Sequence, residues 1–297
     1  MNRVSVAVPR KGRPLEAVLE RVASRGGATD VADDIISTLQ YEKALTKDNQ
    51  TDERGVYERL AAYSDTDGGP EYTLLRDDRD GFPRRVVFDA CTFTVDEYEV
   101  ELIGREEPFR ALRKHEFALG FDSADLVLEE VVGLRPEPLG SLAEVNERID
   151  PRDTDVRVVG GLGDTVHHTL LADRELLEAD RSLDRSFVDD YEGPFCISPR
   201  YERLVEAVLG TDAIEGLEFV YPGDGHEEEE SAIADVGAGA YLTVTGGTAR
   251  DHGLVVGERL FPSETVLLEN TGELDDPARE LARHLVAGIE TELAVEA

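Results

Sequence analysis

Lysine, cysteine and tryptophan are scarce in this chain of 297 residues. It has no tryptophan and two cysteines, and only four of its 31 basic residues are lysines. Arginine therefore carries most of the positive charge. The 65 acidic residues outnumber the basic ones and leave a formal net charge of −34 at pH 7. A chain with this charge repels a phosphate backbone, which excludes sequence-independent binding to nucleic acid.

The few cysteines and histidines form no pattern that is typical of a metal site. Cys91 and Cys196 lie too far apart for a metal-ligand motif. They can form a disulfide or remain two buried thiols, and we expect the thiols. His167 and His168 are neighbours, but adjacent strand residues point to opposite faces, so we do not expect them to share an ion.

No membrane or export signal is visible either. No run approaches the ~18 apolar residues of a membrane span, and Met1–Pro9 lacks the pattern of a signal peptide. Although disordered chains are also acidic, hydrophobic residues make up 40% of this one and occur in patterned segments. We therefore interpret it as a folded cytoplasmic protein of a halophile, whose acidic surface keeps it soluble in concentrated salt.

Strand-like and helix-like patterns alternate along the chain. A buried strand is predicted at 3–8, and a helix at 15–24 has apolar residues at helical spacing. Residues 44–70 are polar and aperiodic, which predicts a solvated insertion. The remaining predicted strands are 72–75, 84–89, 98–103, 117–121, 156–159, 166–171, 195–198 and 217–220, and the remaining helices are 106–116, 124–130, 142–149, 199–209 and 277–293.

Two glycine-containing loops are candidates for binding phosphate. Thr245, Gly246, Gly247 and Thr248 follow a β-prone run, and threonine hydroxyls with glycine N–H groups at a strand-to-helix junction form an anion cradle. A plain glycine turn is the alternative. Near the start of the chain, Lys11 and Arg13 can hold a phosphate while Gly12 allows close backbone approach. A solvated basic loop is the alternative there.

Four segments resemble the catalytic part of ATP phosphoribosyltransferase, the first enzyme of histidine biosynthesis. They are VAVPRKGRPLEAVLERV at 6–22, REEPFRALRKHEFALGFDSADLVLEE at 105–130, VRVVGGLGDTVHHTLLADREL at 156–176 and the segment 225–254. In the last segment, GHEE resembles the family's G-S-x-E, and YLTVTGGTARDHGL resembles its phosphoribosyl-pyrophosphate loop. The long form of that family has a further C-terminal regulatory domain that binds histidine, and we expect this chain to lack it.

The resemblance implies an α/β fold of two lobes, similar to type II periplasmic binding proteins, with a ligand cleft between the lobes. Lobe I would take 1–130 and 245–297, with the polar insertion near 44–70, and lobe II would take 131–244. The implied reaction converts ATP and phosphoribosyl pyrophosphate, with Mg²⁺, to phosphoribosyl-ATP and pyrophosphate. Thr245–Thr248 would hold the 5′-phosphate, and Glu228 would contact the ribose or Mg²⁺. A homo-oligomer or a regulatory partner subunit is compatible with the family, and we expect no direct protein metal site and name no catalytic residue.

One departure from the family pattern leaves a second function open. Tyr241 stands where the family's phosphate loop has an aspartate. Losing one charge-assisted contact costs about 1.5–3 kcal/mol, enough to impair binding. The alternative is therefore a catalytically degenerate relative that serves as a small-ligand sensor or a partner subunit.

Overall fold

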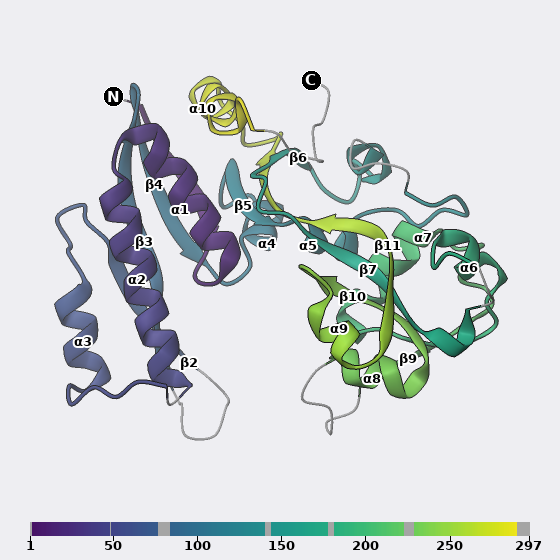
Figure 1. Cartoon of the computed structure of the whole chain (residues 1–297). Coiled ribbons are helices and arrows are strands. Elements are labelled where there is room, and N and C mark those ends of the chain that lie inside the picture. Colours follow the sequence, from purple (N-terminus) through teal and green to yellow (C-terminus); the bar gives the residue numbers. More distant parts are fainter. Residues whose placement is uncertain are drawn as a thin grey trace. The chain divides into compact units, whose positions relative to one another are not determined.

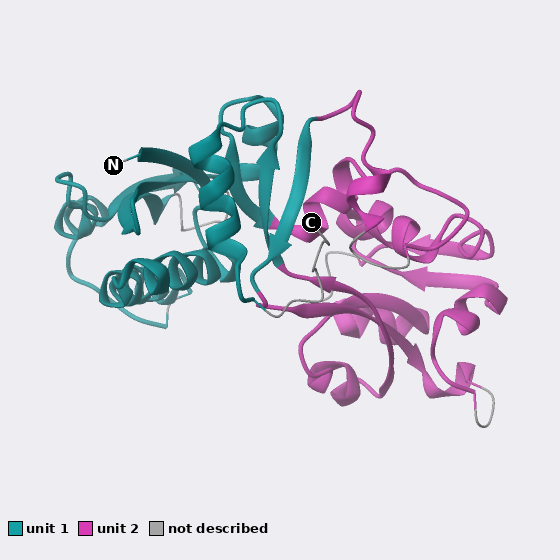
Figure 2. Cartoon of the chain, turned by 90° about the horizontal axis from the view of Figure 1, so that it is seen from above, with its two compact units in different colours: residues 1–122, 155–162, 265–289 teal, residues 123–154, 163–264, 290–297 magenta. Residues whose placement is uncertain are grey.

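The computed structural model describes residues 2–47, 49–76, 84–139, 144–177, 181–222 and 229–289. The chain forms two compact units, coloured separately in Figure 2. Unit 1 contains residues 1–122, 155–162 and 265–289, and unit 2 contains 123–154 and 163–264 among the described residues. Each unit has its own β-sheet with helices beside it, so the predicted α/β class with two sheet-centred parts is confirmed.

The sheet of unit 1 has seven strands in the order β2-β3-β4-β1-β5-β12-β6. Its central strand β1 is parallel to β4 and to β5, whereas β2, β3 and β4 form an antiparallel meander. The strands are β1 (Asn2–Pro9), β2 (Glu71–Arg76), β3 (Arg84–Val95), β4 (Tyr98–Arg105), β5 (Leu119–Ser123), β6 (Val156–Gly161) and β12 (Thr265–Asn270). The parallel pairing places the chain segments that follow β1, β4 and β5 at one edge of the sheet.

Alternate side chains of β1 lie on one face of the sheet and belong to the core of unit 1. Val4, Val6 and Val8 are buried in one cluster with apolar residues of the helices α1, α2 and α10. The helices of unit 1 are α1 (Arg13–Gly26), α2 (Thr29–Thr46), α3 (Val56–Tyr63), α4 (Pro108–Arg113) and α10 (Asp276–Val286). Figure 1 shows α1 and α2 running side by side over the strands β3 and β4. The predicted helix at 106–116 is shorter in the structure, where α4 ends at Arg113.

The prediction that 44–70 is only a solvated insertion is wrong. Helix α3 forms inside it and packs on the core of unit 1 through Val56, Leu60 and Tyr63. These three residues have helical spacing, but the polar residues around them conceal it over so short a length. The Glu58 carboxylate accepts a hydrogen bond from the N–H of Gly55 at 2.9 Å, which satisfies a donor at the start of the helix.

The sheet of unit 2 has five strands in the order β11-β7-β10-β8-β9. Strand β10 lies between β7, to which it is antiparallel, and β8, to which it is parallel. The strands are β7 (Val166–Asp173), β8 (Gly193–Cys196), β9 (Leu217–Val220), β10 (Ala238–Thr243) and β11 (Leu254–Ser263). The helices of unit 2 are α5 (Ala124–Glu130), α6 (Arg185–Asp190), α7 (Glu202–Leu209), α8 (Glu229–Val236) and α9 (Gly247–Asp251).

The chain returns to unit 1 later than the sequence indicated. The predicted return was near 245, but β11 pairs with β7 and belongs to the sheet of unit 2. Strand β12 then pairs with β6 in unit 1, so the return falls at Thr265. In the same way, α5 belongs to unit 2, although the prediction placed 124–130 in the first lobe. These boundaries depend on pairing between strands that are distant in the sequence.

Three smaller sequence predictions can be checked directly. Cys91 and Cys196 are both buried free thiols, as expected. His167 and His168 lie next to each other on β7; His168 is fully buried and His167 is not, which agrees with opposite faces. None of the described helices has both the length and the apolar character needed to cross a membrane.

Candidate functional site

The residues predicted to form a phosphate loop lie in the turn between β10 and α9. Gly246 lies in the left-handed region, with φ 67° and ψ 21°, and precedes the first residue of α9. A side chain at this position would meet Val256, because a Cβ built there lies 2.8 Å from a Val256 methyl carbon. Glycine is therefore needed at Gly246 both for backbone conformation and for space.

The polar groups of this turn are available at the surface. Thr245, Gly247 and Thr248 are exposed, whereas Gly246 is buried beneath them. The first N–H groups of a helix have no partner within the helix, so they can bind an anion. The Gly247 N–H points at the Thr245 hydroxyl at a long 3.4 Å, a weak contact that a phosphate oxygen could replace.

An arginine that the sequence analysis overlooked supports the turn. The Arg250 guanidinium donates to the Thr245 carbonyl at 2.8 Å, which places a positive charge beside the turn. The Arg250 N–H also donates to the Gly246 carbonyl at 3.2 Å. Arg250 follows Thr245 by five residues in the sequence, and this spacing was the available signal. The turn thus combines N–H groups, hydroxyls and one cation.

Tyr241 is tied to unit 2 rather than left open to a ligand. It is half-buried on β10 and packs against the small core cluster that includes Cys196 and Ile233. Burial raises the pKa of the Tyr241 phenol, and a side-chain hydrogen bond with Glu229 raises it further. The phenol therefore stays neutral and holds a carboxylate of α8 next to β10. The predicted ribose-contacting residue Glu228 lies outside the described residues.

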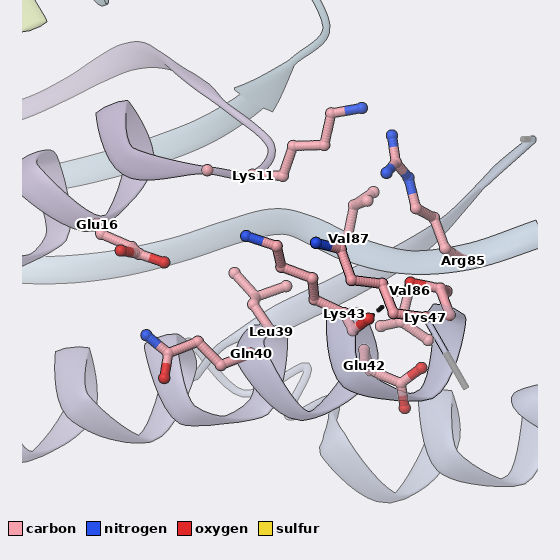
Figure 3. Close-up of a pocket in the computed structure, with 12 residues that line it drawn as sticks. Lys11, Glu16, Leu39, Gln40, Glu42, Lys43, Lys47, Arg85, Val86 and Val87 are labelled. Carbon is pink, nitrogen blue, oxygen red and sulfur yellow. Dashed lines mark hydrogen bonds between the residues drawn. The ribbon is translucent and has the colours of Figure 1, made fainter. Parts of the chain in front are cut away.

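The second predicted loop lines a pocket in unit 1. Lys11 and Gly12 contribute to a cavity of about 370 Å³ that is also lined by α1, α2 and β3, and Arg13 begins α1. Figure 3 shows the pocket. Gly12 has φ 81°, a conformation that favours glycine. Arg10 anchors the loop, because its guanidinium lies 3.1 Å from the Asp89 carboxylate and donates to the Gly104 carbonyl at 3.2 Å.

The predicted site residues are divided between the two units. Lys11, Gly12 and Arg13 belong to unit 1, and Thr245–Thr248 belong to unit 2. Each group is locally ordered by glycines in left-handed conformations. Among the described residues, no three histidine, cysteine or acidic side chains are grouped as metal ligands.

A buried polar cluster in unit 2 was not predicted. The His168 imidazole lies 3.2 Å from the Asp125 carboxylate. The Tyr201 ring packs edge-on against the His168 ring, with 4.7 Å between the ring centroids. Ser263 donates to Asp125 at 3.0 Å. Nearby, burial raises the pKa of Glu129 to about 7, although the Arg200 guanidinium at 3.3 Å opposes the shift. These residues are distant in sequence, so no local motif indicated them.

Comparison with known proteins decides the family. The family model described as "Halobacterial ATP phosphoribosyltransferase" matches residues 1–296. The chain belongs to this family. The match covers both candidate loops and agrees with the resemblance noted in the sequence. No curated protein matches the chain.

The solved structures that match the chain have low sequence identity to it. The ATP phosphoribosyl transferase (HisG:HisZ) complex from Thermotoga maritima is 11% identical over 95% of this chain and 94% of that chain, with a TM-score of 0.42. YhfZ from Shigella flexneri is 13% identical over 96% and 85%, also with a TM-score of 0.42. The periplasmic VFT2 domain of BvgS from Bordetella pertussis is 12% identical over 98% and 90%, with a TM-score of 0.39.

Proposed function

We propose that this protein catalyses the transfer of a phosphoribosyl group from phosphoribosyl pyrophosphate to ATP, with release of phosphoribosyl-ATP and pyrophosphate. Membership of the ATP phosphoribosyltransferase family supports the reaction class. The observation that carries the proposal is the turn at Gly246, which presents the Thr245 and Thr248 hydroxyls and helix N–H groups beside Arg250. This set of donors suits the 5′-phosphate of a phosphoribosyl group.

The chemistry requires positioning and charge stabilisation more than a nucleophilic side chain. The bond between the ribose and the pyrophosphate oxygen breaks, a bond from ribose to an ATP nitrogen forms, and the electron pair leaves with pyrophosphate. Preorganised donors that hold the two phosphate ends can lower the barrier of such a step. We therefore propose binding roles for Thr245, Gly246, Gly247 and Thr248, and no nucleophile.

Mg²⁺ enters this proposal as part of the substrate. Among the described residues, no three histidine, cysteine or acidic side chains are grouped as ligands. Mg²⁺ commonly binds through substrate phosphates and a few carboxylates while retaining water. We propose that phosphoribosyl pyrophosphate binds as its Mg²⁺ complex and that the protein contacts mainly the phosphates and the ribose.

Tyr241 gives the alternative function a specific basis. Its phenol fills the strand position of the family's aspartate and is hydrogen-bonded to Glu229. In the enzyme hypothesis, Glu229 replaces the missing carboxylate beside β10. In the alternative, the replacement leaves a protein that binds phosphoribosyl pyrophosphate without turning it over.

The first test is an assay of pyrophosphate release in molar KCl with ATP, Mg²⁺ and phosphoribosyl pyrophosphate. The second is calorimetric titration of the protein with phosphoribosyl pyrophosphate. We expect turnover, and we expect Thr248→Val to weaken phosphoribosyl pyrophosphate binding by about 1–2 kcal/mol, because it removes one hydroxyl and keeps the shape. Thr51→Val, at an exposed position between α2 and α3, is the matched control. Binding without turnover would favour the catalytically degenerate relative. Unchanged binding by Thr248→Val would show that the Thr248 hydroxyl does not contact the phosphate and that the turn only connects β10 and α9.

A further inference from the structure

An arginine follows the strand next to β10 at the same edge of the sheet of unit 2. Strands β8 and β10 are parallel neighbours, so their carboxyl ends lie at one edge. The segment after β10 is the turn at Gly246, and the segment after β8 contains Arg200 in a short 3₁₀ helix, Pro199–Tyr201. Arg200 therefore lies at the edge of the sheet that also carries the candidate phosphate turn.

The chain leaves these two strands toward opposite faces of the sheet. Tyr241 of β10 packs into the cluster that contains residues of α8 and α9. The next residue, Leu242, lies on the other face, opposite His168, whose imidazole is next to Asp125 of α5. Helix α5 packs against α7, which follows β8. Open α/β sheets bind their ligands at the carboxyl ends of neighbouring strands whose connections diverge in this way.

A ring contact holds the segment after β8 close to β10. The Tyr201 ring packs against the His168 ring, with 4.7 Å between the centroids. His168 is the cross-strand partner of Leu242, which precedes Thr245 by three residues. Arg200, the residue before Tyr201, is therefore placed near the end of β10 by contacts within unit 2.

The Arg200 guanidinium is held at one side and exposed at the other. Its Nε lies 3.3 Å from the Glu129 carboxylate, and its central carbon lies 5.6 Å from the centroid of the Tyr201 ring. The Glu129 side chain is 13% exposed, whereas that of Arg200 is 56% exposed. Within the described part of the chain, no hydrogen bond to a protein acceptor engages the two amino groups of Arg200. These groups form a fork that can bind phosphate oxygens in pairs.

The other arginine at this edge is already used by the protein. The Arg250 guanidinium donates to the Thr245 carbonyl at 2.8 Å and supports the turn that we assign to the 5′-phosphate. Phosphoribosyl pyrophosphate carries a second group of phosphates on the opposite side of its ribose. In a chain with 65 acidic and 31 basic residues, an exposed guanidinium beside the turn is a specific source of positive charge for that group.

We propose that Arg200 binds the pyrophosphate end of phosphoribosyl pyrophosphate and that Glu129 positions the Arg200 guanidinium. The identity of the substrate in this inference rests on the proposed function. When the bond between the ribose and the pyrophosphate oxygen breaks, the electron pair leaves with pyrophosphate, whose negative charge grows. The amino groups of Arg200 stabilise that charge. Glu129 acts through Arg200 and does not touch the substrate.

The experiment is calorimetric titration of the full chain with pyrophosphate and Mg²⁺ in molar KCl at pH 8, without ATP. We expect the native protein to bind pyrophosphate, and Arg200→Gln to bind it about tenfold or more weakly, because a charge-assisted contact is lost. Arg200→Lys keeps the charge but not the fork, so its affinity should lie between those two.

Arg181→Gln is the matched control. The Arg181 guanidinium also pairs with a carboxylate, that of Asp190 at 2.6 Å, and lies 5.7 Å from the centroid of the Phe187 ring. It precedes α6, and α6 leads into the amino end of β8, so Arg181 lies away from the edge that carries the turn. Arg181→Gln should bind pyrophosphate as the native protein does.

Two substitutions of Glu129 test its positioning role. Glu129→Gln keeps an oxygen that can accept a hydrogen bond from Arg200, whereas Glu129→Leu has a similar size and no acceptor. Pyrophosphate affinity should be retained in Glu129→Gln and fall by about fivefold in Glu129→Leu, because one orienting contact is lost. Equal affinities in these two variants would overturn the positioning role of Glu129.

Two results would overturn the role of Arg200. One is no binding of pyrophosphate by the native protein, and the other is equal pyrophosphate affinity in Arg200→Gln and Arg181→Gln. Circular dichroism and the thermal midpoint report whether each variant is folded. If Arg200→Gln does not fold, Arg200→Lys replaces it and should still bind pyrophosphate more weakly than the native protein and Arg181→Gln.

Kinetics separate this inference from the proposed function. Arg200→Gln should lower kcat and raise KM for phosphoribosyl pyrophosphate, while KM for ATP stays constant, because the lost contact is with the leaving group. Pyrophosphate binding that depends on Arg200 in a protein without turnover would end the proposed function and leave the binding role of Arg200 intact. Turnover with unchanged kinetics in Arg200→Gln would end this inference and leave the proposed function intact.

Discussion

Gly246 offers the sharpest test of the turn between β10 and α9, because its neighbour Gly247 is a matched control. In Gly246→Ala, the new methyl group must occupy a left-handed backbone position, with its carbon 2.8 Å from a Val256 methyl carbon. In Gly247→Ala, the methyl group joins the first turn of α9, and its nearest neighbour is the Thr245 hydroxyl at 3.5 Å, an ordinary contact. The two substitutions add the same atom one residue apart.

The two substitutions should change the stability of the protein differently. A left-handed conformation costs a residue with a side chain roughly 1–2 kcal/mol, and moving Val256 off its preferred rotamer adds roughly 0.5–1.5 kcal/mol. Gly246→Ala should therefore destabilise unit 2 by roughly 2–3 kcal/mol or distort the turn. Alanine is favoured over glycine inside a helix by up to about 1 kcal/mol. Gly247→Ala should leave stability unchanged or slightly raised.

Two measurements check this comparison. Thermal midpoints in molar KCl report stability, and titration with phosphoribosyl pyrophosphate reports whether the turn still binds. Combining Gly246→Ala with Val256→Ala should cost less than the sum of the single substitutions, because the smaller side chain removes the clash but not the backbone strain. Equal midpoints for Gly246→Ala and Gly247→Ala would refute the conclusion that the left-handed conformation and the close approach of Val256 require glycine.

Three further predictions concern salt, pH and the tyrosine of β10. The thermal midpoint should rise steeply with KCl, because the Debye length falls from ~10 Å at 0.1 M to ~3 Å at 1 M and weakens the repulsion among acidic side chains; a flat midpoint would remove the halophilic interpretation. The folded-state pKa of Glu129 is raised to about 7 from its ordinary value of 4.5, so its contribution to stability is present below about pH 4.5 and lost as pH rises through 7. The difference in unfolding free energy between native protein and Glu129→Gln should follow that window, and a constant difference from pH 4 to about 8 would contradict it. Tyr241→Asp places two carboxylates together, because Glu229 is the hydrogen-bond partner of Tyr241. We expect this variant to bind phosphoribosyl pyrophosphate more tightly than the native protein when Mg²⁺ is present, but not when it is absent. Equal affinities with and without Mg²⁺ would argue against a role for a carboxylate at this position.

Local patterns predicted much of the secondary structure. The helix at 124–130 and the strand at 217–220 have the predicted bounds, because a capping serine and a short run with an aromatic residue and a valine act within a few residues. Helix α3 was missed since only three apolar residues face the core. The strands of 156–159 and 166–171 were predicted individually, but their assignment to different units depends on partners far along the chain.

One candidate site follows from the local sequence, whereas the other depends on the tertiary structure. The conformation of the turn at Gly246 and the exposure of Thr245 and Thr248 follow from a strand, two glycines and a short helix in sequence, so the sequence by itself determined them. The pocket of unit 1 beside Lys11 depends on the pairing of β1 with β4 and of β4 with β3, which brings Lys11 and Arg85 to the side where α2 packs. Only the tertiary structure decided that grouping, because charges attract a ligand according to their distance in space and not their separation along the chain.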